Sequence, residues 1–173
     1  MNTIKNTPLA LVTGASRGIG RAIAETLAGA GYDLVLTCSR TLPELSDLAI
    51  SLEEKYGIHC TAQIADASDP VAMDQLFASL DHLDVLVNNA GISYIGLLTD
   101  MSVEEWQHII NTNLSSCFYT SRLAIPLMLQ KHSGRIINIS SVWGNVGASM
   151  EVAYSASKGG INSFTKALAK ELA

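Results

Sequence analysis

Tyr154 and Lys158 combine residue types and a spacing that could carry out proton transfer. They lie four positions apart in Tyr154-Ser155-Ala156-Ser157-Lys158, so on a helix their side chains share one face. A free tyrosine has a pKa of about 10, and a nearby ammonium lowers such a pKa by favouring the phenolate. Tyr154 is therefore predicted to be the general acid in reduction of a carbonyl and the general base in the reverse reaction. Such pairs also occur by chance on many helices, so the prediction depends on context.

A glycine-rich loop supplies the first part of that context. The segment 13–20 reads Thr-Gly-Ala-Ser-Arg-Gly-Ile-Gly and follows the apolar run Leu9–Val12. Glycines permit a tight turn and close approach of the backbone to a ligand. The helix that follows offers unpaired N–H groups and a positive dipole end to a pyrophosphate. The GxxxGxG spacing differs from GxGxxG, and such a turn can simply be tight, but its place in a first βα unit favours a dinucleotide.

The elements that must position these residues are short β-rich runs separated by longer helical segments. Uniformly apolar strands between helices indicate βαβ units around a buried parallel sheet. The predicted strands are Leu9–Val12, Asp33–Thr37, Ile58–Ile64, Val85–Asn88 and Arg135–Ile139. The predicted helices are Gly18–Ala30, Pro43–Tyr56, Asp69–Leu80, Ser102–Lys131 (with Pro126 expected to kink it or cost it a hydrogen bond) and Tyr154 to the end. We predict one α/β domain over 1–173, a Rossmann-type doubly wound sheet with five strands.

Three ordered motifs resemble the classical short-chain dehydrogenase/reductase family. They are the glycine loop, Asn88-Asn89-Ala90-Gly91 after the fourth strand, and Tyr-x-x-x-Lys, and the resemblance runs from about Pro8 to the last residue. It implies hydride transfer between a nicotinamide cofactor and a carbonyl.

The resemblance also implies the role of each catalytic residue. Ser141, thirteen residues before Tyr154, would stabilise charge on the carbonyl oxygen, while Ser140 would point the other way and be structural. Lys158 would also bind the nicotinamide ribose. Asn113 would hold a water that links Lys158 to solvent, although its residue type also fits a local bend or an exposed position.

The cofactor prediction rests on the end of the second strand, which reads Thr37-Cys38-Ser39-Arg40. No carboxylate is present for the 2′-hydroxyl of NAD, whereas Arg40, with Ser39, can bind the 2′-phosphate of NADP. Arg17 is the second basic residue that NADP-preferring members often show, although both arginines could be solvated surface charges. We predict NADP(H).

Two polar residues complete the predicted cofactor site, each with a structural alternative. Asp66 matches the family residue that meets the adenine amine, and otherwise fits an N-cap or a turn. Asn88 matches the segment that closes over the adenosine, and otherwise ties neighbouring strands together. The full predicted cofactor set is Gly14, Ser16, Arg17, Gly18, Ile19, Gly20, Ser39, Arg40, Asp66, Asn88, Ala90, Gly91, Tyr154 and Lys158.

Composition excludes several other classes of protein. The 173 residues are 48% hydrophobic and 16% charged, with a net charge of −5 and no basic run, so nucleic acid is not an expected partner. Three scattered cysteines suit a reducing compartment. The N-terminus lacks an apolar signal core, and no apolar run is long enough to span a membrane. The histidines show no metal-ligand spacing, and we expect a cytoplasmic protein without a metal.

Substrate and assembly follow from the resemblance alone. The loop together with Asn-Ile-Ser-Ser at 138–141 is most similar to bacterial 3-oxoacyl-[acyl-carrier-protein] reductases of fatty-acid synthesis. Reductases of another small ketone, a sugar or a xenobiotic share much of this signature. Lys131 and His132 could touch an acidic carrier protein or simply complement a helix dipole. Family members pair through the helices expected around 102–131 and after Tyr154, so we expect a homodimer.

The C-terminal end departs from the family pattern. Residues 168–173 still read as a helix without a Gly or Pro stop signal, whereas classical members continue to further strands and a substrate lid. We expect a truncated form of a full-length enzyme. One alternative is that a partner copy covers the edge of the sheet that the fifth strand leaves exposed. The other is that the remaining residues exist in the natural protein and are absent only from this sequence. A nucleotide-binding module without turnover is the second functional hypothesis.

Overall fold

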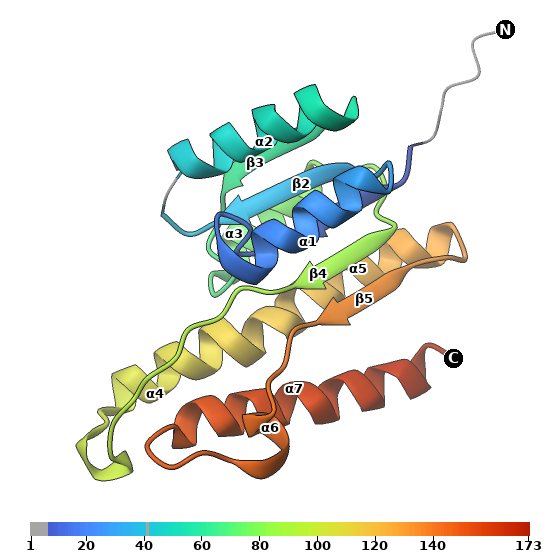
Figure 1. Cartoon of the computed structure of the whole chain (residues 1–173). Helices are drawn as coiled ribbons and strands as arrows, with labels where there is room; N and C mark the ends of the chain where they lie inside the picture. Colours follow the sequence, from blue (N-terminus) through green and yellow to red (C-terminus); the bar gives the residue numbers. More distant parts are fainter. Residues whose placement is uncertain (1–6, 41) are drawn as a thin grey trace, which may run out of the picture.

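Five parallel strands form the centre of the computed structural model, which describes residues 7–40 and 42–173. The strands are β1 (Leu9–Val12), β2 (Asp33–Cys38), β3 (Cys60–Ile64), β4 (Val85–Asn88) and β5 (Arg135–Asn138). Their order is β3-β2-β1-β4-β5, and every neighbouring pair is parallel (Figure 1). The chain reverses direction across the sheet between β3 and β4, so a topological switch point lies between β1 and β4. The predicted Rossmann-type fold is confirmed.

Helices connect the strands and cover the sheet. They are α1 (Gly18–Gly29), α2 (Leu42–Tyr56), α3 (Pro70–Ala78), the 3₁₀ turn η1 (Leu98–Asp100), α4 (Val103–Ile110), the π-helical turn η2 (Asn111–Ser115), α5 (Ser116–Gln130), α6 (Trp143–Val146) and α7 (Val152–Glu171). The predicted start signals are present, since Asp69 caps α3 ahead of Pro70, and Ser102 with Glu105 forms a capping box on α4. None of the described helices is long and apolar enough to cross a membrane.

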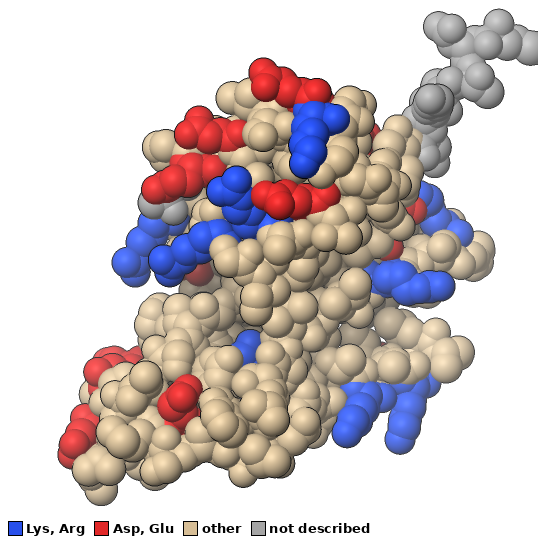
Figure 2. Space-filling view, in the orientation of Figure 1, with Lys and Arg blue, Asp and Glu red and all other residues tan. Residues whose placement is uncertain are grey.

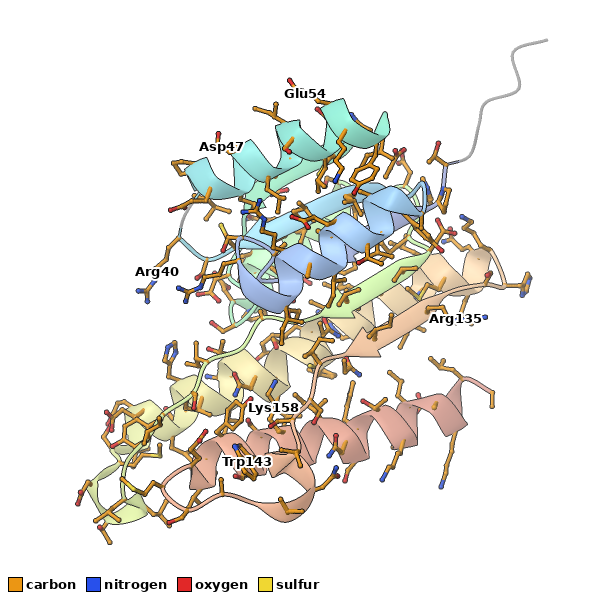
Figure 3. The ribbon with its side chains drawn as sticks, in the orientation of Figure 1. Arg40, Asp47, Glu54, Arg135, Trp143 and Lys158 are labelled. Carbon is orange, nitrogen blue, oxygen red and sulfur yellow. The ribbon has the colours of Figure 1, made fainter. Side chains whose placement is uncertain are left out.

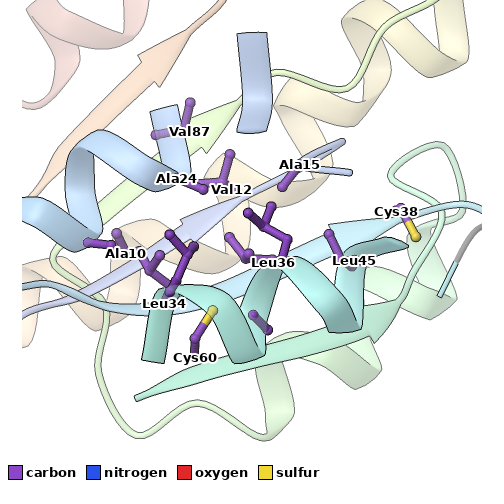
Figure 4. Close-up of a cluster of buried hydrophobic side chains, with 14 of the residues drawn as sticks. Ala10, Val12, Ala15, Ala24, Leu34, Leu36, Cys38, Leu45, Cys60 and Val87 are labelled. Atoms are coloured by element: carbon purple, nitrogen blue, oxygen red, sulfur yellow. The ribbon is translucent and has the colours of Figure 1, made fainter. Parts of the chain in front are cut away.

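Two buried clusters hold the layers together because strand side chains alternate between the faces of a sheet. On one face, Val12 and Leu36 pack with side chains of α1 and α2, including Leu45 (Figure 4). On the other face, Leu11 and Leu86 pack with side chains of α3 and α5. The central strands are thus buried on both faces. This packing fixes the position of the loops that follow their carboxyl ends, where those loops can contact a ligand.

The long predicted helix over 102–131 is interrupted in the structure. It divides into α4, the π turn η2 and α5, and the π turn contains Asn113. α5 continues through Pro126, so the local change in helical geometry lies at 111–115, well before that proline. π turns of this kind are frequent at functional sites.

Several other boundaries differ from the prediction. β3 begins at Cys60 rather than Ile58, and α7 begins at Val152, which places Tyr154 in its first turn. The short helix α6 was not predicted. The polar residues 1–6 lie outside the described part of the chain.

Candidate active site

The glycine loop is fastened to the end of the neighbouring strand β4 by two polar side chains. Thr13 Oγ1 accepts hydrogen bonds from the backbone N–H groups of Asn89 and Ala90, both at 3.1 Å. In return, Asn89 Nδ2 donates to the carbonyls of Thr13 at 2.9 Å and Gly14 at 3.0 Å. Sequence analysis did not assign a role to Thr13 or Asn89, although both lie inside the recognised motifs. Their contacts hold the loop in shape before any ligand arrives.

The same loop is tightly packed at Gly14 and Gly20 but open at Gly18, and a phosphate needs such open space beside the backbone. A Cβ on Gly14 would lie 2.9 Å from Ala90 Cα, and one on Gly20 would lie 2.4 Å from the Gly14 carbonyl oxygen. At Gly18, where φ is +57°, a Cβ would meet nothing within 4 Å. This free space adjoins the N-terminus of α1, whose unpaired N–H groups favour an anion. The loop therefore fits the pyrophosphate of a dinucleotide.

The predicted adenosine-side residues lie near this loop at the carboxyl ends of β1 to β3. Arg17, Ser39 and Arg40 are exposed, and Arg40 extends from the molecule beyond the end of β2 (Figure 3). Asp66 does not cap α3. Its Oδ1 accepts hydrogen bonds from the backbone and side chain of Ser68 at 2.9 and 2.8 Å, which makes it a turn residue. Of the remaining predicted cofactor residues, Ser16 is half-buried and Ile19 is 63% exposed.

Tyr154 and Lys158 lie on one face of α7, as their spacing predicts. Lys158 Nζ is 5.7 Å from the centroid of the Tyr154 ring and donates a 2.8 Å hydrogen bond to the carbonyl of Ile139, just beyond β5. Lys158 is only 4% exposed, and this burial lowers its pKa, an effect that the neighbouring Cys117 opposes only in part. A Cβ on Gly91 would lie 3.5 Å from Lys158 Nζ, so the loop after β4 reaches the same place.

The two serines after β5 have different contacts. Ser140 Oγ donates to the carbonyl of Lys158 at 3.1 Å and so ties the strand end to α7, which agrees with the structural role expected for it. Ser141 Oγ accepts a 3.2 Å hydrogen bond from the N–H of Trp143, next to α6. Ser141 is half-buried and keeps its hydroxyl hydrogen for another acceptor.

Asn113 is fully buried, so the alternative of an exposed polar position is wrong. Its Oδ1 accepts from Ile92 N at 2.8 Å, while its Nδ2 donates to Ile92 O at 2.9 Å and to Ser157 Oγ at 3.0 Å. The side chain thus joins η2, the loop after β4 and α7. These bonds engage the side-chain amide of Asn113, while its backbone carbonyl accepts a hydrogen bond from Cys117 Sγ at 3.4 Å.

Asn88 belongs to a chain of polar side chains that crosses the molecule. It accepts a 2.7 Å hydrogen bond from Thr120 of α5 and donates at 2.8 Å to Asn138 of β5. Asn138 in turn donates to Thr165 of α7 at 2.9 Å. The alternative that Asn88 ties neighbouring strands together therefore describes its contacts. These hydrogen bonds fix the spacing between α5, the sheet and α7, the helix that carries Tyr154 and Lys158.

Lys131, which could contact an acidic carrier protein, already has a charged partner within the fold. Lys131 forms an ion pair with Asp84, which also accepts a 2.9 Å hydrogen bond from the N–H of Leu9.

Across residues 7–40 and 42–173, no three His, Cys, Asp or Glu side chains gather closely enough to hold a metal ion.

A doubly wound sheet with a glycine loop after its first strand and a Tyr–Lys pair at its carboxyl edge defines a Rossmann-type oxidoreductase. The sequence pattern of the short chain dehydrogenase family matches residues 8–173. The chain therefore belongs to the short-chain dehydrogenase family.

Individual relatives agree with this assignment. The chain is 41% identical to an uncharacterized oxidoreductase of Bacillus subtilis over 165 residues, covering 95% of this chain and 68% of that protein. It is also 41% identical to the 3-oxoacyl-[acyl-carrier-protein] reductase FabG of Escherichia coli over 169 residues, covering 95% and 67%. A short-chain dehydrogenase from Sphingobium yanoikuyae in complex with NADPH superposes with a TM-score of 0.90 at 30% identity, covering 95% and 65%. The chain thus spans about two thirds of the length of these relatives.

Proposed function

We propose that this protein uses NADPH to reduce a carbonyl group to a hydroxyl group. The observation that carries the proposal is the Tyr154–Lys158 pair at the carboxyl edge of the sheet, beside a glycine loop with free space above Gly18. Residues 1–173 are proposed to form one dinucleotide-binding and catalytic unit.

The residues of this chain divide the chemistry between them. Bound NADPH supplies the hydride. Tyr154 donates the proton to the carbonyl oxygen, and Ser141 donates a hydrogen bond that stabilises the charge developing there. The Lys158 ammonium, 5.7 Å from the centroid of the Tyr154 ring, attracts the negative charge left on Tyr154 after the proton has moved to the carbonyl oxygen. Asn113 holds the loop after β4 and α7 in register, and its carbonyl is the proposed site of the relay water.

The preference for NADPH over NADH rests on the end of β2. Ser39 and Arg40 are exposed there without an acidic neighbour in the segment 37–40, and solved relatives are described in complex with NADPH or NADP. We expect NADPH to bind more tightly than NADH, and Arg40→Ala to reduce the ratio of the two dissociation constants. Arg135→Ala, an exposed arginine at the opposite end of the sheet (Figure 3), serves as the control. Tighter binding of NADH by the unchanged protein would overturn the preference.

The best-supported substrate is a 3-oxoacyl group carried on acyl carrier protein. The support is the similarity to reductases of that name from Escherichia coli and Staphylococcus aureus and the apolar side chains exposed around the site, among them Ile95, Trp143 and Met150. A competing substrate class is a sugar, because an L-sorbose reductase of Gluconobacter frateurii is 30% identical with a TM-score of 0.92. The test is NADPH oxidation with an acetoacetyl thioester and, separately, with L-sorbose. Tight NADPH binding without oxidation of either substrate would favour a binding module instead.

Assembly and location are further parts of the proposal. α5 and α7 expose apolar surface between them, where Phe118 is 51% exposed beside a shallow pocket lined by Leu114, Tyr119 and Phe164. We propose that two copies of the chain form a homodimer through these helices. Light scattering that shows monomers only would contradict this proposal. The three buried free cysteines support a reducing, cytoplasmic location.

A further inference from the structure

Two loops meet beside the proposed active site and are joined through a carboxylate. Ser93 Oγ, in the loop after β4, donates a 2.9 Å hydrogen bond to Glu151 Oε2, at the N-terminal boundary of α7. A second bond joins the same loops, from the N–H of Gly96 to the carbonyl of Met150 at 2.9 Å. Met150 has a φ of +64°, a conformation that costs a non-glycine residue free energy and that the surrounding contacts must maintain.

The two joined residues adjoin the segments that carry or contact the proposed reacting groups. Ser93 lies two positions after Gly91, whose Cβ position is 3.5 Å from Lys158 Nζ. Glu151 lies three positions before Tyr154, and its carbonyl accepts the N–H of Ser155 at 2.8 Å, so it borders the first turn of α7. The Ser93 hydrogen bond therefore holds the carboxylate beside the loop after β4, at the start of the helical turn that carries Tyr154.

This carboxylate has little charge around it to compensate its field. Within residues 7–40 and 42–173, Glu151 forms no ion pair with a lysine, arginine or histidine. The surrounding segments expose apolar side chains, such as Ile95 in the loop after β4, Trp143 at the start of α6 and Val152 at the start of α7. Figure 2 shows the same contrast, since much of the surface over α6 and α7 is uncharged while charged side chains gather over α1 and α2.

We propose that Glu151 is a specificity-determining residue that admits neutral carbonyl substrates and rejects anionic ones. A substrate that carries a carboxylate near its carbonyl group would approach the fixed negative charge of Glu151, and bringing like charges together is costly. The proposal rests on the proposed function and narrows it. It favours acyl groups held as esters, thioesters or amides over the corresponding free oxo acids, because the linkage removes the charge next to the reacting carbonyl.

The test compares acetoacetate with acetoacetamide, which differ mainly in charge. We would measure kcat/KM for both with NADPH, and the dissociation constants of both in the presence of bound NADP⁺ by ligand-observed NMR. Glu151→Gln keeps an acceptor for Ser93 and removes the charge. We expect Glu151→Gln to raise kcat/KM for acetoacetate by about 3- to 10-fold relative to kcat/KM for acetoacetamide. Added salt should reduce the same discrimination in the unchanged protein. Glu104→Gln, an exposed position in α4, should leave the ratio unchanged.

The outcomes separate this inference from the proposed function. Reduction of the amide with an unchanged ratio in Glu151→Gln would overturn the inference and leave the proposed function standing. If neither compound is reduced, the proposed turnover fails and the dissociation constants test Glu151 alone. Equal binding of the two ligands, or binding of neither, would then overturn the inference.

Discussion

The ammonium of Lys158 donates its 2.8 Å hydrogen bond to the carbonyl of Ile139, one residue beyond the end of β5. The strand thus holds the cation that the proposed chemistry needs. β5 pairs with β4 alone among the described strands, and Ile137 in it is 46% exposed. Whatever positions this strand also positions Lys158, so the geometry of the site depends on the packing of β5 as well as on the catalytic motif.

Lys158 is expected to lose its proton at an unusually low pH for a lysine. Burial lowers its pKa below the ordinary value of 10.5, and Cys117 offsets this only partly. The charged form is therefore present below the lowered pKa and disappears as the pH rises through it. Selective ¹³C labelling of lysine side chains, with Lys158→Arg to assign the signal, measures the midpoint by NMR. A midpoint at or above 10.5 would contradict the assigned burial.

Gly20→Ala is expected to weaken NADPH binding by at least about tenfold. The new methyl group would lie 2.4 Å from the Gly14 carbonyl oxygen and 2.5 Å from Asn89 Nδ2, so the loop would have to move. Gly31→Ala is the matched control, because at Gly31 φ is +84° and nothing lies within 4 Å of the added Cβ. It should cost roughly 1–2 kcal/mol of stability and leave the dissociation constant unchanged. Equal NADPH affinity in both variants would refute this account of the loop.

Asp84→Asn is expected to destabilise the fold by about 1–2 kcal/mol at neutral pH. Burial acts to raise the pKa of Asp84, but hydrogen bonds from Lys131 and the N–H of Leu9, with the charges of Lys131 and His82, outweigh it and lower that pKa. Because the unfolded carboxyl has the higher pKa, the stabilisation is fully present above about pH 4 and is lost as the pH falls through the lowered folded value.

Urea unfolding at neutral and acidic pH measures the effect of Asp84→Asn. The variant should lose stability at neutral pH and show a weaker dependence on acid than the unchanged protein. Asp81→Asn, at an exposed neighbouring position, provides the control. The same acid dependence in Asp84→Asn as in the unchanged protein would show that this pair does not contribute.

Most of the sheet could be predicted because the pattern that defines it is local. Apolar runs bounded by glycines and caps predicted β1 and β4 to the residue, and the Asp69-Pro70 and Ser102–Glu105 signals predicted two helix starts. The spacing of Tyr154 and Lys158 predicted their shared face. Each of these inferences uses residues within a few positions of one another.

What sequence reasoning missed depends on contacts between distant segments. The π turn at 111–115 has no local signal, because residues from the loop after β4 and from α7 engage Asn113 across 21 and 44 positions. The roles of Thr13 and Asn89 arise from hydrogen bonds across 76 positions. Glu151 reads as an ordinary residue before a helix until Ser93 is placed beside it, 58 positions away.

The most direct test of the proposed chemistry is NADPH oxidation by Tyr154→Phe, measured beside its NADPH dissociation constant, with an acetoacetyl thioester as substrate. Phenylalanine keeps the ring and removes only the hydroxyl that donates the proton. We predict an NADPH affinity within about twofold of the unchanged protein and turnover lower by about 10²- to 10⁴-fold. Tyr32→Phe, a tyrosine packed on the cluster between the sheet and α1, should keep its turnover. Undiminished turnover in Tyr154→Phe, with the unchanged protein active, would contradict the assignment of Tyr154 as the general acid.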